Sequence, residues 1–405
     1  MESEIQKLRF TRTPNLETGN PQEKKAELIE YLRATSALYE KLFEVVKDKK
    51  SLLKKPDPLR RPLIFYLGHT AAFFINKLIL PGNIPSRVNP KLESMLADDV
   101  DEMDWDDNDE SHFEWPSYEE IMEYRAKVRE TLEKAIESWT LTLPITFGSS
   151  PFWTLIMGIE YERLHFETTS VLIRRLPAEE VQDHALFPIC QEINYSGYDD
   201  QGNPKVDDKF PRNEILTVPE GTVELNKRDG YYGWDNQFGT HTANVKQFGA
   251  SKFLASNYEF WEFMQAGGYT TEKYWTEEGW KWCSSKVVEK PLFWMPDKVV
   301  NGKQTYKYRT LTKVIDMPWD WPVEVNFHEA KAFCNWKSEV TGKPIRLLSE
   351  EEYYRIRDNL KGDQPNWEFG KVGNINLEYA ASSCPVNKFS INGFYDVVGN
   401  VWQHT

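Results

Sequence analysis

The stretch that decides the fold reads Tyr161-Glu162-Arg163-Leu164-His165-Phe166-Glu167 and lies inside a largely apolar segment, residues 151–176. The length and apolar content of this segment predict the longest helix of the N-terminal half. Because residues four apart share one face of a helix, Tyr161 and His165 lie one turn apart, and the small Gly158 continues their stripe. A phenol and an imidazole on the inner face of a helix are typical of a metal or catalytic site inside a helical bundle.

Three further helices are predicted ahead of this one. Asn20-Pro21-Gln22-Glu23 supplies an N-cap, a proline at the first helical position and an acidic third residue, and apolar residues follow at helical spacing. A second, nearly all-apolar helix is expected over residues 57–80, and a third over residues 117–139 begins with a capping box. Four helices, one long connection and inward polar residues predict a four-helix bundle.

His69 lies in the middle of the second predicted helix. A single histidine in an apolar helix is most often a core residue with a satisfied hydrogen bond, because burying an imidazole without a partner is costly. The second inward histidine, His165, gives both imidazoles a reason to be inside the bundle. We therefore predict a shared site, with a plain core histidine as the alternative.

The connection over residues 84–116 contains Arg87 and a dense acidic run, residues 98–107. A charge run is usually a solvated loop. The tryptophan and methionine inside this run suggest instead that it packs across the bundle. Both interpretations are open at this point.

Helical periodicity stops near residue 178, and short apolar runs such as Gly221-Thr222-Val223-Glu224-Leu225 then alternate with clusters of Gly, Asn, Asp and Pro. Two helices interrupt this pattern, one from Asn257 and one over residues 328–341. The pattern predicts a loop-rich α+β domain. The expected domain organisation is an N-terminal arm, a bundle and this second domain: residues 1–20, 21–178 and 179–405.

The overall composition limits the classes of function. A chain of 405 residues with 40% hydrophobic content is long enough for two packed domains, and its net charge of −14 argues against nucleic acid or an anionic membrane as the main partner. The chain has no run of 18 apolar residues and no basic-then-apolar N-terminus, which favours a soluble cytoplasmic protein. The spacing of the four cysteines suits neither a zinc knuckle nor a disulfide framework, and Cys334 is expected to be a small buried hydrophobe.

Several motifs in the second half resemble the formylglycine-generating-enzyme (sulfatase-modifying factor) fold, and the bundle resembles the DinB-like domain. The motifs are Trp234-Asp235-Asn236, Ser256-Asn257-Tyr258-Glu259-Phe260, Pro322-Val323-Glu324-Val325-Asn326-Phe327-His328, Arg346-Leu347-Leu348-Ser349-Glu350 and Gly393-Phe394-Tyr395-Asp396-Val397-Val398-Gly399-Asn400-Val401-Trp402. The implied fold class is α+β multidomain: a DinB-like four-helix bundle followed by a formylglycine-generating-enzyme, C-type-lectin-like α+β domain.

This pair of domains resembles the sulfoxide synthases of ergothioneine and ovothiol biosynthesis. Two stretches are more similar to the ovothiol branch: Ser86-Arg87-Val88-Asn89-Pro90 with the acidic run, and Glu167-Thr168-Thr169-Ser170-Val171-Leu172-Ile173-Arg174. The resemblance implies a non-haem iron oxidoreductase with Fe(2+) as its cofactor. Such an enzyme uses O2 to join the sulfur of L-cysteine to the imidazole of L-histidine as 5-histidylcysteine sulfoxide. The implied partners are these small molecules, with no nucleic acid and no membrane.

Three histidines bind the iron in this family, one on an early bundle helix and two from an HxxxHxE motif. His69 matches the first, His165 matches the second histidine of the motif, and Glu167 matches its acidic member. The first position of the motif is Tyr161 here, which departs from the pattern. Either the phenol completes the ligand set, since phenolate is a hard anionic ligand, or Tyr161 is a packing residue and the site binds iron poorly. Glu167 is expected to be a supporting partner behind the ligands.

Three residues are candidates for substrate binding. Arg87 suits a substrate carboxylate, because a guanidinium meets a carboxylate through two parallel hydrogen bonds; an ordinary loop arginine is the alternative. Asn400 and Trp402 are expected on a segment that faces the interdomain cleft, although Trp402 also suits a core. The family fold continues past the end of this sequence, through its active-site tyrosine region, so the resemblance implies an incomplete domain and assigns no catalytic residue. His404 stands where the fold usually has an aromatic residue, which predicts a local substitution rather than a ligand.

Two other functions are open at the level of sequence. One is a related synthase of the ergothioneine or selenoneine type, which acts on another thiol or selenol donor or on trimethylhistidine. The other is a non-catalytic relic that binds a small molecule. Tyr161 and the abrupt end of the sequence favour the relic.

Overall fold

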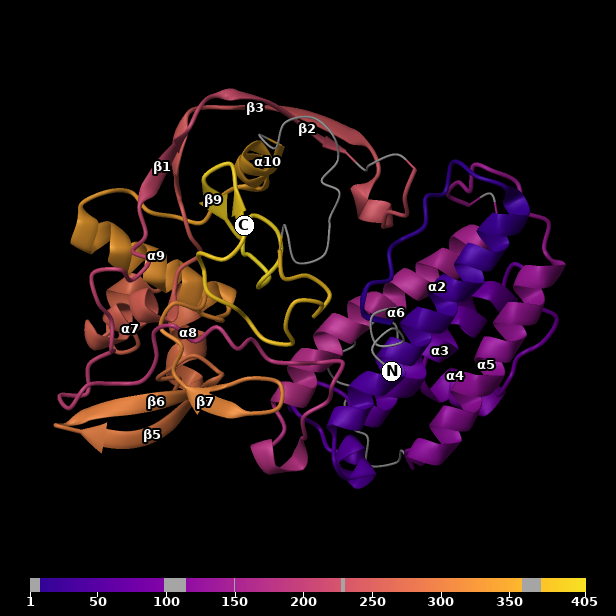
Figure 1. The fold of residues 1–405 in the computed structure, drawn as a ribbon, viewed down its shortest axis with the longest axis horizontal. Coiled ribbons are helices and arrows are strands. Elements are labelled where there is room, and N and C mark those ends of the chain that lie inside the picture. Colours follow the sequence, from indigo (N-terminus) through magenta and orange to yellow (C-terminus); the bar gives the residue numbers. More distant parts are fainter. Residues whose placement is uncertain (1–7, 98–113, 149, 227–229, 359–372) are drawn as a thin grey trace. The chain divides into compact units, whose positions relative to one another are not determined.

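The chain forms two compact units in the computed structural model, which describes residues 8–97, 114–148, 150–226, 230–358 and 373–405 (Figure 1). The first unit comprises Met1–Leu186 and Lys227–Gly239, and the second comprises Phe187–Asn226 and Thr240–Thr405. The first boundary therefore falls later than the expected residue 178. The reason is local: Val181 pairs with Val46, and the Gln182 N–H donates to the Val45 carbonyl, which keeps this segment on the bundle.

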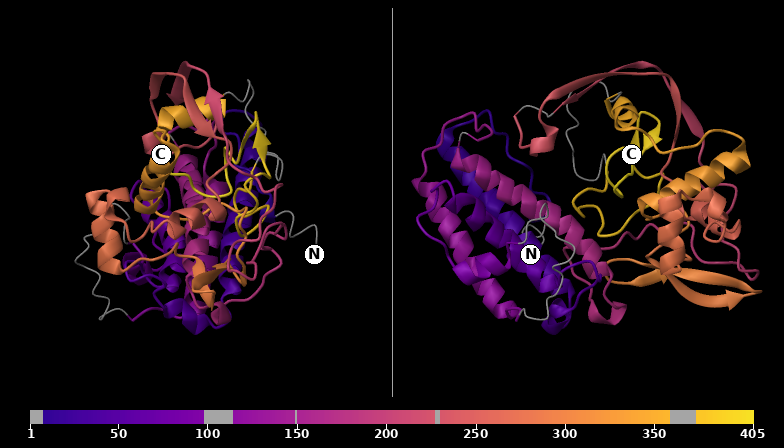
Figure 2. Two further views of the ribbon diagram at one scale, coloured as in Figure 1. Left: turned by 90° about the vertical axis from the view of Figure 1, so that its left-hand side faces the viewer. Right: turned by 180° about the vertical axis from the view of Figure 1, so that it is seen from behind.

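Four long helices form the first unit, as predicted. They are α2 (Pro21–Leu42), α3 (Leu63–Ile79), α5 (Tyr118–Ser138) and α6 (Pro151–Arg174), and they run alongside one another in the views of Figures 1 and 2. Shorter pieces lie between them: η1 (Phe43–Val45), η2 (Lys49–Leu53), α4 (Pro90–Met95) and, after α6, η5 (Ala178–Glu180). Helices α3 and α6 pack against each other, and α3 also packs against α5 while α6 also packs against α2.

The helix starts follow local chemistry. The Asn20 side chain accepts hydrogen bonds from the N–H groups of Gln22 and Glu23, and Ser117 forms the predicted capping box, so both expected starts are confirmed. The expected start of α3 at residue 57 is wrong, because the helix begins only at Leu63. Pro62 explains the delay, since a proline disfavours helical geometry in the residue before it.

Close packing of α3 on α6 depends on Gly158. A Cβ atom at this position would lie 2.3 Å from the Phe74 ring of α3, which is far inside van der Waals contact. The glycine therefore lets the two helices approach closely about one turn away from the level where His69 and Tyr161 face each other.

The expected N-terminal arm is packed where the structure describes it. Leu16 is buried, its N–H donates to the Gly230 carbonyl, and its own carbonyl accepts from the Ile145 N–H. Residues 227–239 were expected in the second domain but group with the first unit. The correction has a physical cause, because Tyr232 and Phe238 pack against aromatic rings of the bundle.

The second unit is the predicted mixture of short strands and helices. Its sheets are small and antiparallel: β1 pairs with β4, β2 with β3, β8 with β9, and β5, β6 and β7 form a three-stranded sheet. The strands are β1 (Ile215–Val218), β2 (Gly221–Asn226), β3 (Thr240–Val245), β4 (Phe248–Ser251), β5 (Trp294–Val300), β6 (Lys303–Arg309), β7 (Val314–Asp316), β8 (Ser390–Ile391) and β9 (Phe394–Tyr395).

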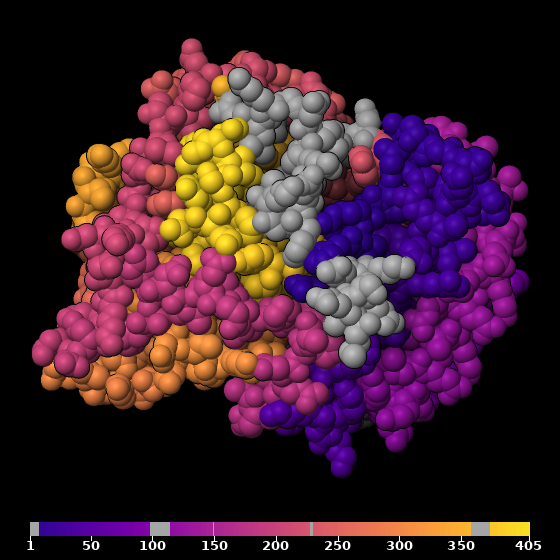
Figure 3. Space-filling model, viewed as in Figure 1, coloured from indigo at the N-terminus to yellow at the C-terminus, as the bar shows by residue number. Residues whose placement is uncertain are grey.

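Helices of the second unit are α7 (Asn257–Gln265), α8 (Glu277–Lys286), α9 (Phe327–Thr341) and α10 (Glu350–Asp358). The expected helices at 257 and 328–341 are confirmed as α7 and α9, whereas α8 and α10 were not predicted because they are short and highly charged. The core of this unit contains the fully buried Trp294, Trp319 and Trp321, which accounts for the high tryptophan content. Residues 373–405, in yellow, reach the surface on the face shown in Figure 3.

All four cysteines are buried free thiols, and the expected burial of Cys334, on α9, is confirmed. None of the helices in the described ranges combines the length and the apolar character needed to cross a membrane. The acidic run, residues 98–107, lies outside the described residues, so its predicted packing stays a prediction.

Candidate metal centre in the helical unit

Three polar side chains meet inside the bundle: His69 from α3, and Tyr161 and His165 from α6. The Tyr161 Oη lies 2.8 Å from His69 Nε2. The ring centroids of His69 and His165 are 5.2 Å apart, and those of Tyr161 and His165 are 4.5 Å apart. The exposed fractions of the three residues are 3%, 9% and 6%. The structure thus brings together all three residues that the sequence predicted as ligands.

The orientation of His69 is fixed by a main-chain group. Its Nδ1 lies 2.7 Å from the carbonyl oxygen of Leu96, which follows α4. Because a carbonyl only accepts, Nδ1 carries the proton and donates it, and Nε2 presents a lone pair. That lone pair accepts the hydrogen bond from the Tyr161 hydroxyl. A neutral imidazole with Nδ1 bonded to a carbonyl and Nε2 directed inward is the usual arrangement of a metal-binding histidine.

Gly68 allows this contact. A Cβ atom at position 68 would lie 2.7 Å from a methyl carbon of Leu96 and 2.9 Å from one of Ile121. The glycine therefore permits Leu96 to approach α3 closely enough to bond His69.

Among the residues that the structure describes, neither ring nitrogen of the buried His165 has a hydrogen-bond partner. Burial, with a smaller contribution from neighbouring His69, lowers the pKa of His165 to about 3, so the ring is neutral near pH 7. A buried polar group without a partner typically costs about 1–3 kcal/mol. A metal ion bound at one ring nitrogen would provide the missing partner.

Aromatic rings surround the site. Phe73 stacks on Tyr161 at a centroid distance of 4.0 Å, and Phe65 stacks on His69 at 4.8 Å. The Trp234 ring, from the segment 230–239, lies 6.3 Å from the Tyr161 ring. These rings exclude water and lower the local dielectric constant, which strengthens any charge interaction inside the site.

The three donors that meet inside the bundle are two imidazoles and a phenol, with no carboxylate among them. Within the described ranges, no group of three or more His, Cys, Asp or Glu side chains is placed to hold a metal ion. The donor set of two imidazoles and one phenol nevertheless suits iron, which accepts both nitrogen and anionic oxygen ligands. The orphaned nitrogens of His165 fit the same interpretation.

Glu162 on α6, a buried carboxylate between Tyr161 and His165 in sequence, is already engaged. It accepts hydrogen bonds from Arg125 at 2.7 Å and from Thr70 at 3.0 Å. Arg125 is itself buried and also donates to Glu40 at 3.0 Å. This network was not predicted from the sequence. A signal was present, because Arg125 follows the apolar Ile121 by four residues and therefore lies on the buried face of the helix.

Glu167 has a less direct relationship to the site. It is half-buried and follows His165 by two residues, which places it on a different face of α6. Its supporting role therefore stays a prediction.

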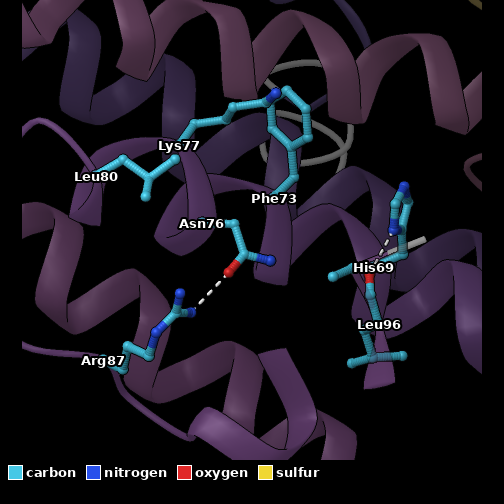
Figure 4. A pocket seen from close by; sticks show the side chains of 8 residues that line it. His69, Phe73, Asn76, Lys77, Leu80, Arg87 and Leu96 are labelled. Atoms are coloured by element: carbon cyan, nitrogen blue, oxygen red, sulfur yellow. Dashed lines mark hydrogen bonds between the residues drawn. The ribbon is translucent and has the colours of Figure 1, made fainter. Parts of the chain in front are cut away.

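A cavity of about 270 Å³ opens beside His69 (Figure 4). It is lined by His69, Phe73, Asn76, Lys77, Leu80, Arg87, Leu96 and Ala97. Arg87 reaches its wall, as a substrate clamp requires, but its Nη1 donates to Asn76 at 2.7 Å and to the fully buried Glu93 at 3.0 Å. Glu93 also accepts from the main chain at Val88 and Asn89, so Arg87 helps to hold this loop.

Asn400 and Trp402 lie in the second unit. Asn400 has a left-handed backbone, with φ of +64°, and its side chain accepts from the Cys384 N–H and donates to the Cys384 carbonyl and to Asp396. The amide therefore holds a loop together. Trp402 is 70% exposed, so the core alternative is wrong. Substrate binding by either residue stays a prediction.

His404 is exposed, with Nε2 at 3.0 Å from the Val325 carbonyl and its ring against Phe327. These contacts agree with the expected local substitution.

Comparisons with known proteins match both units. Residues 200–405 match the family described as Sulfatase-modifying factor enzyme 1-like domain, and residues 17–169 match the DinB superfamily. A Mycolicibacterium smegmatis protein named hercynine oxygenase is 24% identical over 385 residues, which cover 88% of this chain and 78% of that protein.

Two other relatives match over shorter regions. Ergothioneine biosynthesis protein 1 of Neurospora crassa is 28% identical over 225 residues, 53% of this chain. This match spans only 25% of the Neurospora protein. Hercynine oxygenase of Mycobacterium tuberculosis is 26% identical over 177 residues, which cover 42% of this chain and 40% of that protein.

Proposed function

We propose an activity from one premise: the chain belongs to the family of proteins that carry a sulfatase-modifying factor enzyme 1-like domain. The proposed activity is that of an oxygen-dependent sulfoxide synthase, an oxidoreductase that joins a thiol sulfur to an imidazole ring. The observation that carries the proposal is the buried pair of His69 and His165, in which the ring nitrogens of His165 have no hydrogen-bond partner among the described residues. The names of the relatives, hercynine oxygenase and ergothioneine biosynthesis protein 1, support the same class of chemistry.

The proposed substrates are L-cysteine, L-histidine and O2, and the product is 5-histidylcysteine sulfoxide, as in ovothiol biosynthesis. Two sequence stretches, 86–90 and 167–174, support this choice through their resemblance to the ovothiol branch. The cavity beside His69, about 270 Å³, is of a size that suits a single amino acid. The competing choice is an ergothioneine-type pair, in which hercynine replaces histidine.

The proposed cofactor is iron, held by His69 and His165. When bound, iron would supply the redox chemistry with O2. The chain's own residues prepare the site for it. The Leu96 carbonyl holds the His69 ring in the required tautomer, the rings of Phe65 and Phe73 exclude water, and Arg87 on the cavity wall offers a cation for a substrate carboxylate.

A cytoplasmic location is part of the proposal. All four cysteines are free thiols, which is the usual state of cysteines in a reducing compartment.

The experiment is an anaerobic reconstitution of the whole chain with Fe(II), followed by addition of cysteine, O2 and either histidine or hercynine. Mass spectrometry then identifies the sulfoxide. Product with histidine supports the ovothiol-type assignment, and product with hercynine alone replaces it by the ergothioneine type. His165→Ala should abolish product, whereas His184→Ala, which removes a histidine at the bundle surface near Glu44, should not.

Two outcomes contradict the catalytic proposal. Bound iron without product under either condition would leave a small-molecule-binding function. Failure of the whole chain to retain iron would exclude an iron enzyme.

A further inference from the structure

We infer that Tyr161, as a phenolate, is the third protein ligand of the metal in this site, and that the site therefore holds iron in the ferric state at rest. The choice of iron rests on the proposed function, but the ligand set is argued from the geometry of this chain. The inference concerns a tyrosine at a position where the resembling family has a histidine.

The distance between the two facing donor atoms supports direct ligation. Tyr161 Oη and His69 Nε2 are 2.8 Å apart. Two donors that each lie about 2.0–2.1 Å from one ion, at right angles to each other, are about 2.8–3.0 Å apart. The separation seen as a hydrogen bond is therefore also that of two adjacent ligands. A metal ion that replaces the shared proton would lie beside the Nε2–Oη line, so the His69 ring has to turn toward it while the separation of the two donors stays the same.

Metal binding replaces the phenol proton of Tyr161. The O–H bond of Tyr161 breaks, an oxygen–metal bond forms, and the proton leaves to water. Metal binding should therefore release a proton that a chain without this phenol does not release.

His165 provides an independent observation. It lies one helical turn after Tyr161 on α6, and in the part of the chain that the structure describes neither of its buried ring nitrogens has a hydrogen-bond partner. Glu162, the buried carboxylate on the same helix, is engaged by Arg125 and Thr70. Among the described residues around the two imidazoles, the phenol of Tyr161 is thus the donor that completes a three-residue set.

The chemical consequence follows from the nature of the donor. Phenolate is a hard anionic ligand and stabilises ferric iron relative to ferrous iron, more than a neutral imidazole does. A ferric ion bound to phenolate also absorbs visible light through charge transfer from the ring to the metal. A site in which Tyr161 only packs against Phe73 would not show this absorption.

Two matched phenol deletions are available. Tyr161→Phe removes only the oxygen and keeps the ring that stacks on Phe73. Tyr66→Phe removes the oxygen of another buried tyrosine, whose ring lies 6.1 Å from the His165 ring. The second variant controls for the loss of any phenol near the site.

The experiment loads the metal-free whole chain with a ferric chelate, removes excess iron and records visible absorption, bound iron and released protons. We expect an absorption band in the wild type and in Tyr66→Phe. In Tyr161→Phe we expect loss of the band and ferric affinity at least about tenfold lower. Tyr161→His should retain iron without the band and should favour the ferrous ion.

The inference is overturned if iron-loaded wild type shows no band, if the chain binds no ferric iron, or if Tyr161→Phe keeps the band. Circular dichroism of each variant verifies folding. No product is measured, so the result is separate from the proposed reaction: a band without synthase activity would contradict only the proposed function, and activity without a band would contradict only the ligand assignment.

Discussion

The hydroxyl of Tyr161 on α6 donates a 2.8 Å hydrogen bond to Nε2 of His69 on α3, and this bond joins the two central helices inside the bundle. It closes a site in which the ring nitrogens of His165 have no hydrogen bond to any described residue. In an ordinary protein core, each of the three polar side chains would have a hydrogen-bond partner. The arrangement thus resembles a ligand set that a bound ion completes.

The first prediction concerns His165→Leu. Replacing an unpartnered imidazole by an apolar side chain should leave the metal-free chain equally stable or stabilise it by up to about 1–3 kcal/mol, because the buried polar group is removed. The same variant should lose any stabilisation by iron. Thermal unfolding with and without iron measures both effects.

His69→Leu is the matched control, since it removes an imidazole that has two partners. It should destabilise the metal-free chain, because the Leu96 carbonyl and the Tyr161 hydroxyl lose their bonds. Equal destabilisation by both variants would contradict the view that His165 is kept for a ligand.

The second prediction concerns Gly68→Ala. The added methyl would lie 2.7 Å from Leu96, so the Leu96 carbonyl should move away from His69. We expect a loss of about 1–3 kcal/mol in stability from overpacking and about a tenfold loss of iron affinity. Iron titration followed by urea unfolding measures the two quantities.

Gly268→Ala in the second unit is the corresponding control, because its added methyl would lie 2.5 Å from Phe263. It should lower stability without changing iron affinity. An unchanged iron affinity in Gly68→Ala would show that the Leu96 contact does not support His69.

The third prediction concerns the buried arginine of the bundle. Arg125→Leu removes the cation that pairs with the buried Glu162, whereas Glu40 keeps Arg129 at 3.0 Å, and the variant should destabilise the first unit by about 3–5 kcal/mol. The double variant Arg125→Leu/Glu162→Leu should recover part of this loss, because one unpaired buried charge is removed. Urea unfolding of the single and double variants provides the test. If the double variant loses as much unfolding free energy as the two single variants together, Arg125 and Glu162 do not stabilise each other.

The fourth prediction is a pH dependence in the second unit. Burial raises the pKa of Asp320 to about 6. Between about pH 4 and pH 6, the Asp320 carboxyl keeps its proton in the folded state but has released it in the unfolded state. The unfolding free energy therefore falls as pH rises through this window, by up to about 1.4 kcal/mol per pH unit. Asp320→Asn, which does not titrate, should lack this contribution.

Unfolding free energies of the wild type and Asp320→Asn at pH 4.5 and about pH 7 provide the comparison. Relative to the wild type, Asp320→Asn should have a larger unfolding free energy at the higher pH than at the lower pH. Parallel pH profiles would contradict the assignment.

Much of the bundle could be predicted from the sequence, because apolar spacing and caps at Asn20 and Ser117 are local signals. The helix register also brought Tyr161 and His165 to one face. The start of α3 was misjudged because Pro58 suits a first helical turn as well as Pro62 does. The signal against the earlier start is the restriction that Pro62 places on Arg61.

Long-range contacts could not be predicted. The bond between Leu96 and His69 comes from a connection without periodicity, and its enabling feature, Gly68, looks like any small residue in an apolar helix. The packing of the Trp234 segment on the bundle was missed for a similar reason, since the segment is separated from its partners by two strands. Trp402 was judged compatible with a core from its size alone, yet its side chain is largely exposed.

The central claim is that His69 and His165 belong to an iron site inside the bundle. The most direct measurement is the iron retained per chain after anaerobic reconstitution and desalting, in the wild type, His165→Ala and His184→Ala. The account predicts stoichiometric iron in the wild type and in His184→Ala, and none in His165→Ala. Absence of iron from the wild type, or equal iron in all three proteins, would contradict it.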